Sequence, residues 1–205
     1  MGPANNTHSD RQKSVEKTQA ILEGAMAEFL AHGYAATSMD RVAATAGVSK
    51  ATVYSHFQDK QRLFTALIQR LVSSKYKTIF GLESDQSLRG EPKVVLRTIA
   101  ENMLDNIQQN PLLLSFMRVI VGESGRFPSL AQPYVQHMAK PVLELLSEYL
   151  GSRTELNLTD PEATARVFIG TLVYYVLLQE VMHGKEILPM ERDRIVDTLV
   201  ELIVR

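Results

Sequence analysis

The stretch TSMDRVAATAGVSKATVYSHF, at residues 37–57, contains two short helical patterns separated by a Gly-Val-Ser turn. The first pattern covers residues 39–46 and the second covers residues 50–56, which predicts a helix, a tight turn and a second helix. Gly47 is suited to the turn because glycine adopts positive φ without a steric cost. A hydroxyl ahead of each helix can accept a hydrogen bond from a free N–H group of the first turn. The residues that can do so are Thr37, Ser38 and Ser49.

Apolar and polar residues of this stretch separate into a buried side and an exposed side. Val42, Val48, Val53 and Phe57 recur at spacings that bring them together, so they predict a small core packed on the preceding helix. Alanines in the predicted helix at residues 39–46 would let the two helices of the motif cross closely. The residues expected to face outward are Lys50, Ala51, Thr52, Tyr54, Ser55 and His56.

An exposed helix with this mixture of basic, hydroxyl, aromatic and small side chains is typical of one that enters the major groove of DNA. Its first residues would meet base edges, while Lys50 and Tyr54 are suited to phosphate oxygens. Lys60 lies in the first turn of the next predicted helix, where free N–H groups favour an anion. We therefore expect double-stranded operator DNA as a partner.

With the following Gln58, Asp59 and Lys60, this stretch resembles the signature of the TetR/AcrR family of transcriptional regulators. The resemblance covers about residues 14–65. Its combination of Ala-Gly-Val-Ser, Tyr-x-x-Phe and the following lysine is far more specific than a bare helix-turn-helix pattern. Gln61 departs from the family, which usually has an acidic residue at this helix surface.

The resemblance implies an all-α homodimer with three N-terminal helices for DNA and a divergent C-terminal domain for ligand and dimer contacts. It also implies that Thr37 binds a phosphate at the start of the second helix. The C-terminal part matches in general pattern alone, so the resemblance does not identify the effector. The positions that usually touch DNA in the family correspond to Lys50, Thr52, Tyr54, His56 and Lys60.

Composition fits an intracellular regulator. The chain has 205 residues, 45% of them hydrophobic, and no cysteine, which excludes a disulfide framework, a thiolate metal site and thiol catalysis. Polar first residues and the lack of a long apolar run predict a cytoplasmic protein without a membrane span. Residues 1–77 carry ten Lys and Arg against six Asp and Glu, and the remainder carries twelve against seventeen. The basic part is where a polyanion is expected, although such a surplus is also ordinary surface variation.

Helical periodicity dominates the rest of the chain and predicts an all-α fold of about nine helices. The first helix should cover about residues 14–31 and stop at Gly33, and a long helix should follow Asp59 toward Phe80. Residues 81–92 are rich in Gly, Ser, Asp and Gln and mark a boundary. Five further helices are expected at residues 92–109, 111–123, 128–150, 161–183 and 190–204. The expected domains are a disordered tail at 1–13, a DNA-binding domain at 14–60, and a ligand-binding and dimerisation domain at 61–205.

Residues 167–178 read VFIGTLVYYVLL and are apolar around nearly the whole circumference, so this helix should be covered on all sides. One face can meet the domain's own core, and a twofold-related copy can cover the other. A helix central to a monomeric bundle is the alternative. The last helix carries a broad apolar stripe and would complete a four-helix interface. The residues assigned to this interface are Phe168, Leu172, Tyr175, Gln179, Ile195, Leu199 and Leu202.

Methionine and aromatic residues of the C-terminal part give it adaptable apolar surface, as a pocket for a small hydrophobic effector would need. The same residues also describe an ordinary core, and for each one the core is the more frequent outcome. The residues assigned to the pocket are Met103, Phe116, Met117, Ile120, Tyr134, Met138, Tyr174 and Tyr175.

The sequence therefore predicts a ligand-responsive regulator, with repression as the expected mode, that binds a pseudo-palindromic operator as a dimer. Two alternatives remain: an architectural DNA-binding protein that senses no ligand, and an all-α enzyme. For the enzyme, the sequence has no Walker loop, no dinucleotide glycine fingerprint, no His-Glu-x-x-His and no Gly-x-Ser-x-Gly. No catalytic residue, cofactor or metal is expected.

Overall fold

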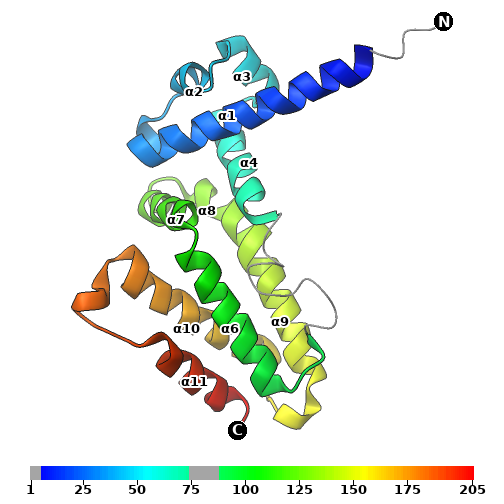
Figure 1. Ribbon diagram of the computed structural model, residues 1–205, viewed down its shortest axis with the longest axis vertical. Coiled ribbons are helices and arrows are strands. Elements are labelled where there is room, and N and C mark those ends of the chain that lie inside the picture. Colours follow the sequence, from blue (N-terminus) through cyan, green and yellow to red (C-terminus); the bar gives the residue numbers. More distant parts are fainter. Residues whose placement is uncertain (1–5, 74–87) are drawn as a thin grey trace, which may run out of the picture. The chain divides into compact units, whose positions relative to one another are not determined.

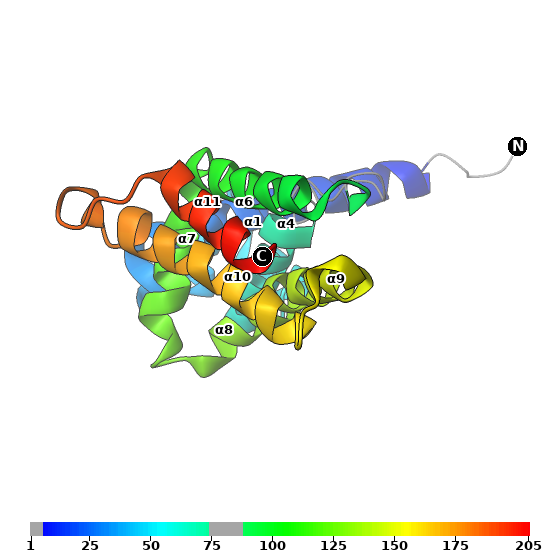
Figure 2. The ribbon, with the colours of Figure 1, turned by 90° about the horizontal axis from the view of Figure 1, so that it is seen from below.

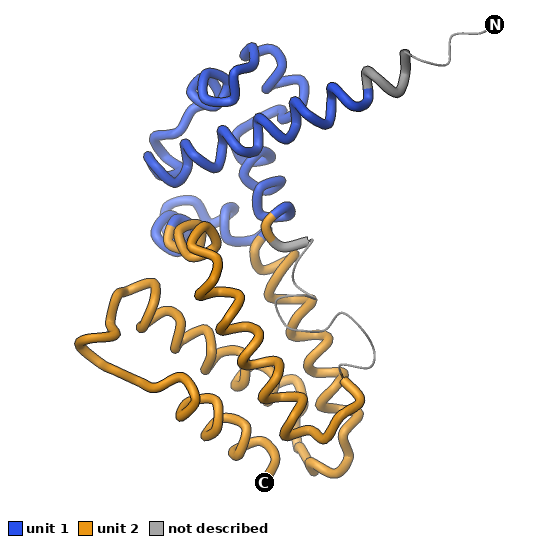
Figure 3. The backbone as a smooth tube through the Cα atoms, viewed as in Figure 1, with its two compact units in different colours: residues 1–70, 119–133 blue, residues 71–118, 134–205 orange. Residues whose placement is uncertain are grey.

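A computed structural model describes residues 6–73 and 88–205, and every regular element in these two ranges is a helix (Figure 1). The predicted all-α fold is confirmed. The chain divides into two compact units, one of residues 1–70 and 119–133 and one of residues 71–118 and 134–205 (Figure 3). Most of the expected boundary at 81–92, and the end of the helix expected to run toward Phe80, lie outside the described residues. Within the described ranges, no helix is long and apolar enough to span a bilayer.

The first unit is built around the first helix. It contains α1 (Asn6–Ala36), α2 (Met39–Thr45), α3 (Lys50–His56) and most of α4 (Lys60–Ser73). The end of α7 (Pro111–Ser124) and most of α8 (Pro128–Tyr134) complete it. α2 packs on α1, and α3 packs on α2.

Four aromatic rings form the centre of the first unit. The centroids of Phe29 and Phe64 lie 5.1 Å apart, and Tyr34 lies 5.3 Å from Phe64 and 5.1 Å from Phe127. These edge-to-face contacts are the arrangement that aromatic quadrupoles favour. They hold the end of α1 against α4.

The first helix begins at Asn6, well before the expected start near Ser14, so residues 6–13 are helical where a disordered tail was expected. Once a helical turn exists, each added residue gains one hydrogen bond, and the Arg-Gln-Lys run at residues 11–13 consists of good helix formers. At the other end the prediction is confirmed, because Gly33 has φ 73° and interrupts the helix.

The second unit holds the C-terminal helices close to their predicted bounds. It contains α6 (Pro92–Gln108), the first part of α7, and a continuous run from the end of α8 through the π-helical η2 (Val135–Ala139) into α9 (Lys140–Ser152). α10 (Pro161–Val176) continues as the π-helical η4 (Leu177–Val181), and α11 (Arg192–Ile203) ends the fold.

Within this unit α10 packs chiefly on α9, and α11 packs chiefly on α6 (Figure 2). Two ion pairs fasten α11 to α6, one between Arg97 and Asp197 and one between Arg192 and Asp105. At the end of η4, the guanidinium of Arg118 donates to the carbonyl oxygens of Glu180 (2.7 Å) and Val181 (3.2 Å). Arg118 therefore caps this helix end, where carbonyls lack intrahelical partners.

Candidate nucleic-acid interface

A serine hydroxyl caps the N-terminus of each helix of the helix-turn-helix. The Oγ of Ser38 accepts from the backbone N of Arg41 at the start of α2, and the Oγ of Ser49 accepts from the backbone N of Thr52 (3.1 Å) at the start of α3. Gly47 has φ 65°, so the turn uses the left-handed conformation predicted for it. These local features fix the angle at which α3 leaves α2.

The buried side of α3 is smaller than predicted. Val53 is fully buried, as is Val42 of α2, whereas Val48 and Phe57 are half-buried at the ends of the helix. The opposite side of α3 is open, because Lys50, Ala51, Tyr54 and Ser55 are exposed and Thr52 and His56 are half-exposed. The predicted outward face is thus present, and the contacts of its residues with DNA remain a prediction.

Close contact with α1 holds the motif in place. At Gly24 of α1 an added Cβ would lie 2.9 Å from the backbone N of Ala46, at the end of α2. The small residues expected to allow a close crossing therefore include a glycine on α1 that the sequence analysis did not single out.

Lys50 has an acidic neighbour. Its Nζ lies 2.8 Å from Oδ1 of Asp40 on α2, and this hydrogen-bonded carboxylate raises the pKa of Lys50. Both side chains are well exposed, so solvent screens the pair and its contribution is small. Lys50 can therefore exchange Asp40 for a phosphate, and it remains a cation throughout the neutral range.

His56 is tied to α1. Its Nδ1 lies 2.9 Å from Oγ1 of Thr18, whose hydroxyl also lies 2.9 Å from the backbone oxygen of Ser14. If the hydroxyl donates its single proton to that carbonyl, Nδ1 of His56 is the donor to Thr18 and Nε2 is the nitrogen left for another partner. Thr18 thus orients the ring.

Thr37 is buried and has its hydroxyl engaged. The hydroxyl donates to the backbone oxygens of Gly33 (2.8 Å) and Glu28 (3.1 Å), and 2% of the residue is exposed. The amine of Lys60 is likewise directed at backbone carbonyls, those of Tyr34, Ala35 and Thr37. Neither side chain presents a free donor at the surface of this structure.

Four of the seven residues assigned to the dimer interface are buried within the chain itself. Phe168, Leu172, Gln179 and Leu199 are buried, while Tyr175 and Ile195 are half-buried and Leu202 is 61% exposed. A buried side chain has no surface left for a partner, so the outward side of α10 is instead the one that carries Val167 and Tyr174. The sequence prediction chose the other side because a helix that is apolar all round does not reveal which side faces the core.

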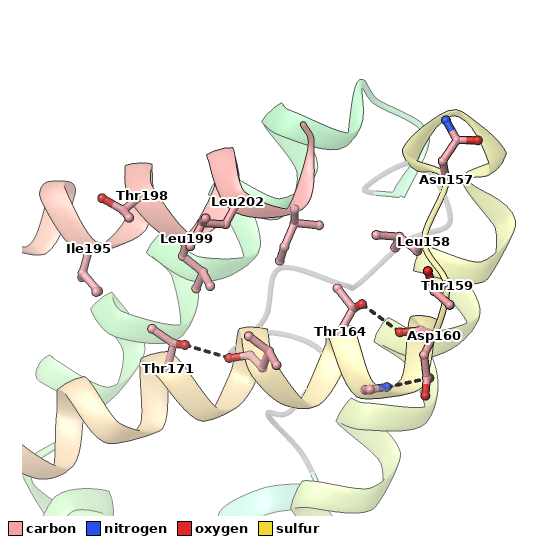
Figure 4. Close-up of a pocket in the computed structure, with 13 residues that line it drawn as sticks. Asn157, Leu158, Thr159, Asp160, Thr164, Thr171, Ile195, Thr198, Leu199 and Leu202 are labelled. Atoms are coloured by element: carbon pink, nitrogen blue, oxygen red, sulfur yellow. Dashed lines mark hydrogen bonds between the residues drawn. The ribbon is translucent and has the colours of Figure 1, made fainter.

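A groove of about 540 Å³ runs between α10 and α11, with residues 157–160 at one end (Figure 4). Its walls are mainly apolar and include the exposed side chains of Val167 and Leu202, with hydroxyls at Thr159, Thr164, Thr171 and Thr198. Three of these hydroxyls, those of Thr164, Thr171 and Thr198, donate to carbonyls of their own helix turn, so they add little polarity.

The residues assigned to an effector pocket differ in their burial. Met103 and Met138 are buried, as are Phe116 and Ile120, whereas Met117 and Tyr134 are half-buried. Burial raises the pKa of Tyr134. Tyr174 is exposed on α10, and the Tyr175 hydroxyl donates to the backbone oxygen of Met190 beside a cavity of about 80 Å³. Met103 belongs to the core of the second unit. Their role as a pocket remains a prediction.

Comparison with known families adds an independent observation. Residues 21–67 match the family described as bacterial regulatory proteins of the tetR family, and residues 94–205 match the C-terminal domain of AefR-like transcriptional repressors. The second match alone covers more than half of the chain. The chain belongs to the TetR family of bacterial transcriptional regulators.

Relatives of similar length agree with this membership. The HTH-type transcriptional regulator YhgD of Bacillus subtilis is 26% identical over 200 residues, which is 94% of this chain and 97% of the relative. A TetR-family regulator from Mesorhizobium loti has a TM-score of 0.74 at 26% identity, covering 93% of this chain and 96% of that one. The flavonoid-responsive regulator FrrA has a TM-score of 0.67 at 26% identity, covering 90% and 91%. These relatives are named as regulators and not as enzymes.

Proposed function

We propose that two copies of this TetR-family chain bind a pseudo-palindromic operator, as a repressor, and that a small hydrophobic effector releases them. The observation that carries the proposal is the face of α3, whose polar residues are open to solvent while Val53 is buried against the motif's core. In a dimer, two such helices would enter successive major grooves about 34 to 36 Å apart. Residues 14–60 would form the DNA-binding domain, and residues 61–205 the ligand-binding and dimerisation domain. The protein would work in the cytoplasm, where the chromosome is.

The residues proposed to contact DNA are those of the motif whose side chains are open to solvent. Lys50 and Tyr54 would contact phosphates, whereas Ala51 and Thr52, on the first turn of α3, would meet base edges. The remaining proposed contacts are Ser38, Ser49, Ser55 and His56, which are exposed or half-exposed.

The apolar outward side of α10 and α11 supports the dimer. Val167, Tyr174 and Leu202 are each about 60% exposed, and Val167 and Leu202 line the same mainly apolar groove. Exposed apolar surface of this kind marks an interaction site. Gly170 lies on the same helix, and an added Cβ there would meet nothing within 4 Å. A twofold copy would bring the same residues from both chains together, with Tyr175 and Ile195 at the edge.

The effector is proposed to be small and largely apolar. FrrA, a relative of nearly the same length, is named as responsive to flavonoids, which are aromatic molecules. The buried methionines and aromatics of the second unit are side chains that adapt to such molecules. An effector that favours a dimer with the wrong helix spacing would lower operator affinity by roughly 5- to 150-fold.

A selection from random duplex DNA at physiological salt tests the regulator. We expect enrichment of an inverted repeat whose half-sites lie about one helical turn apart. Recovery of no sequence motif would contradict the proposal and favour an architectural protein. A thermal-shift screen with flavonoids and other apolar aromatics then tests the effector, because a true effector raises the melting temperature and releases the selected operator.

A further inference from the structure

The amine of Lys60 lies among three backbone carbonyl oxygens. Nζ donates to the oxygen of Tyr34 (2.7 Å), of Thr37 (2.8 Å) and of Ala35 (3.3 Å). A lysine ammonium has three N–H donors and no acceptor, so these carbonyls account for all of its donors. The amine also lies 4.4 Å from the centroid of the Tyr34 ring, within the range of a cation–π contact.

The three carbonyls belong to the connection between α1 and α2. Gly33 interrupts α1, so the carbonyls that follow it lack regular helical partners, and a cation near such a helix end is favourable. Burial lowers the pKa of Lys60, while the nearby carboxylate of Glu123 opposes this effect. Lys60, at the start of α4, therefore supplies hydrogen-bond donors to carbonyls at the end of α1.

Glu123 of α7 holds the same connection from another side. Its Oε1 accepts a hydrogen bond from the backbone N of Ala35 (3.3 Å). At Gly33, an added Cβ would lie 3.0 Å from the same oxygen. Lys60 therefore binds three carbonyls of this connection, and Glu123 binds the N–H group of Ala35.

The start of α4 offers little to a phosphate. The carboxylate of Asp59 accepts from the backbone N of Arg62 (2.7 Å), and its second oxygen lies 3.7 Å from Nε of Arg62. A carboxylate at this place both occupies an N–H group that an anion would need and repels a phosphate. Asp59 therefore works against the phosphate contact that the sequence predicted beside it.

We propose that Lys60 is a positioning residue that fastens the α1–α2 connection to α4 and so orients the helix-turn-helix, and that its amine contacts no DNA phosphate. This inference rests on the proposed operator binding, and it reverses the role that the sequence and the family resemblance gave to Lys60. Loss of the three hydrogen bonds would free the α1–α2 connection and change the angle at which α3 meets its site.

Two matched variants, Lys60→Met and Lys50→Met, separate positioning from phosphate contact. We would measure affinity for the selected operator and for a random duplex between roughly 50 and 200 mM salt. Lys50→Met should weaken binding to both duplexes and reduce the salt slope by about one contact. Lys60→Met should leave the slope and the random-duplex affinity unchanged and lower the operator-to-random affinity ratio about tenfold, which corresponds to about 1.4 kcal/mol.

Two outcomes would overturn the proposal. A salt slope reduced by about one in Lys60→Met, with both duplexes weakened alike, would restore the phosphate contact. A lowered melting temperature with an unchanged affinity ratio would mean that the carbonyl contacts stabilise the fold without positioning α3. If the wild-type protein itself prefers no sequence, the proposed function fails, and the random-duplex slopes still report on the phosphate contact.

A measurement on the wild-type protein covers the case in which Lys60→Met does not fold. Nitrogen-15 labelling of the lysine side chains should reveal a protected Lys60 ammonium signal in the DNA-free protein, since its protons are shared with carbonyls. The signal should keep its position when the operator is added. A large shift, or a coupling to phosphorus, would contradict the proposal.

Discussion

α3 and α10 each bury one side and present the other, yet their outward sides differ in chemistry. The open side of α3 carries Lys50, Thr52 and Tyr54, whose polar atoms remain hydrated until a partner replaces the water. The open side of α10 carries Val167 and Tyr174, whose exposure costs free energy until another apolar surface covers them. The first kind of surface suits a polyanion, and the second suits a copy of the same protein.

The largest expected effect comes from a charge on the apolar side. Val167→Arg would place an unpaired charge within the proposed dimer interface, which costs several kcal/mol when the partner covers it. We expect a monomer by sedimentation and a loss of operator affinity of more than tenfold, because both half-sites are then no longer bound together. The control is Val94→Arg on α6, a valine of similar exposure (56% against 60%). A dimer that persists in Val167→Arg would exclude this face as the interface.

The next effect tests how α3 is held. In Gly24→Ala the new methyl would lie 2.9 Å from the backbone of Ala46, so α1 and α2 must separate. The strain should cost about 1–3 kcal/mol, partly offset by the better helix propensity of alanine. Urea unfolding and operator affinity should both fall. Gly122→Ala on α7 is the control, since nothing lies within 4 Å of its added Cβ and the same propensity gain applies there. Equal stability of the two variants would contradict the close crossing.

The two helices also differ in how far the sequence determines them. On α3 the apolar Val53 stands among polar residues, so periodicity alone identifies its outward face. On α10 the residues from 167 to 178 are apolar on every side, so periodicity cannot choose between Phe168 and Val167 as the buried one. The helix bounds, in contrast, could be predicted for both because Ser49 and the Asp160-Pro161 pair are strong start signals.

Some roles could not be predicted because they depend on residues far apart in the chain. The sequence placed Lys60 at DNA by its local position, and the family resemblance placed Thr37 there. In the structure Lys60 donates to the carbonyl oxygens of Tyr34, Ala35 and Thr37. The Thr37 hydroxyl donates to those of Gly33 and Glu28. Glu123 approaches the same connection from 88 residues further along the chain. No spacing rule relates such positions.

A smaller effect compares one threonine on each helix. Thr52→Val removes a hydroxyl from the first turn of α3, and we expect a changed base preference at one position of each half-site, worth about 1–1.5 kcal/mol for a single hydrogen bond. Thr171→Val makes the same change on α10, where the hydroxyl donates to the backbone oxygen of Val167. Selections from random DNA should differ from wild type for Thr52→Val alone. An unchanged motif would remove Thr52 from the base contacts.

The smallest effect compares the two helix caps. Oγ of Ser49 accepts from the N of Thr52 at 3.1 Å, and Oδ1 of Asp160 accepts from the N of Ala163 at 2.9 Å. Replacing either residue by alanine leaves a helical N–H without its partner and should cost about 1 kcal/mol in urea unfolding. Asp160→Asn keeps an acceptor but removes a negative charge from the N-terminus of α10, so its cost should lie nearer 0.3–1 kcal/mol and shrink in high salt. Only the Ser49 variant should also weaken operator binding, because its cap holds the helix that meets DNA, whereas the cap at Asp160 holds a helix that meets protein. Equal losses of operator affinity in Ser49→Ala and Asp160→Ala would contradict the assignment of α3 to DNA and of α10 to protein contacts.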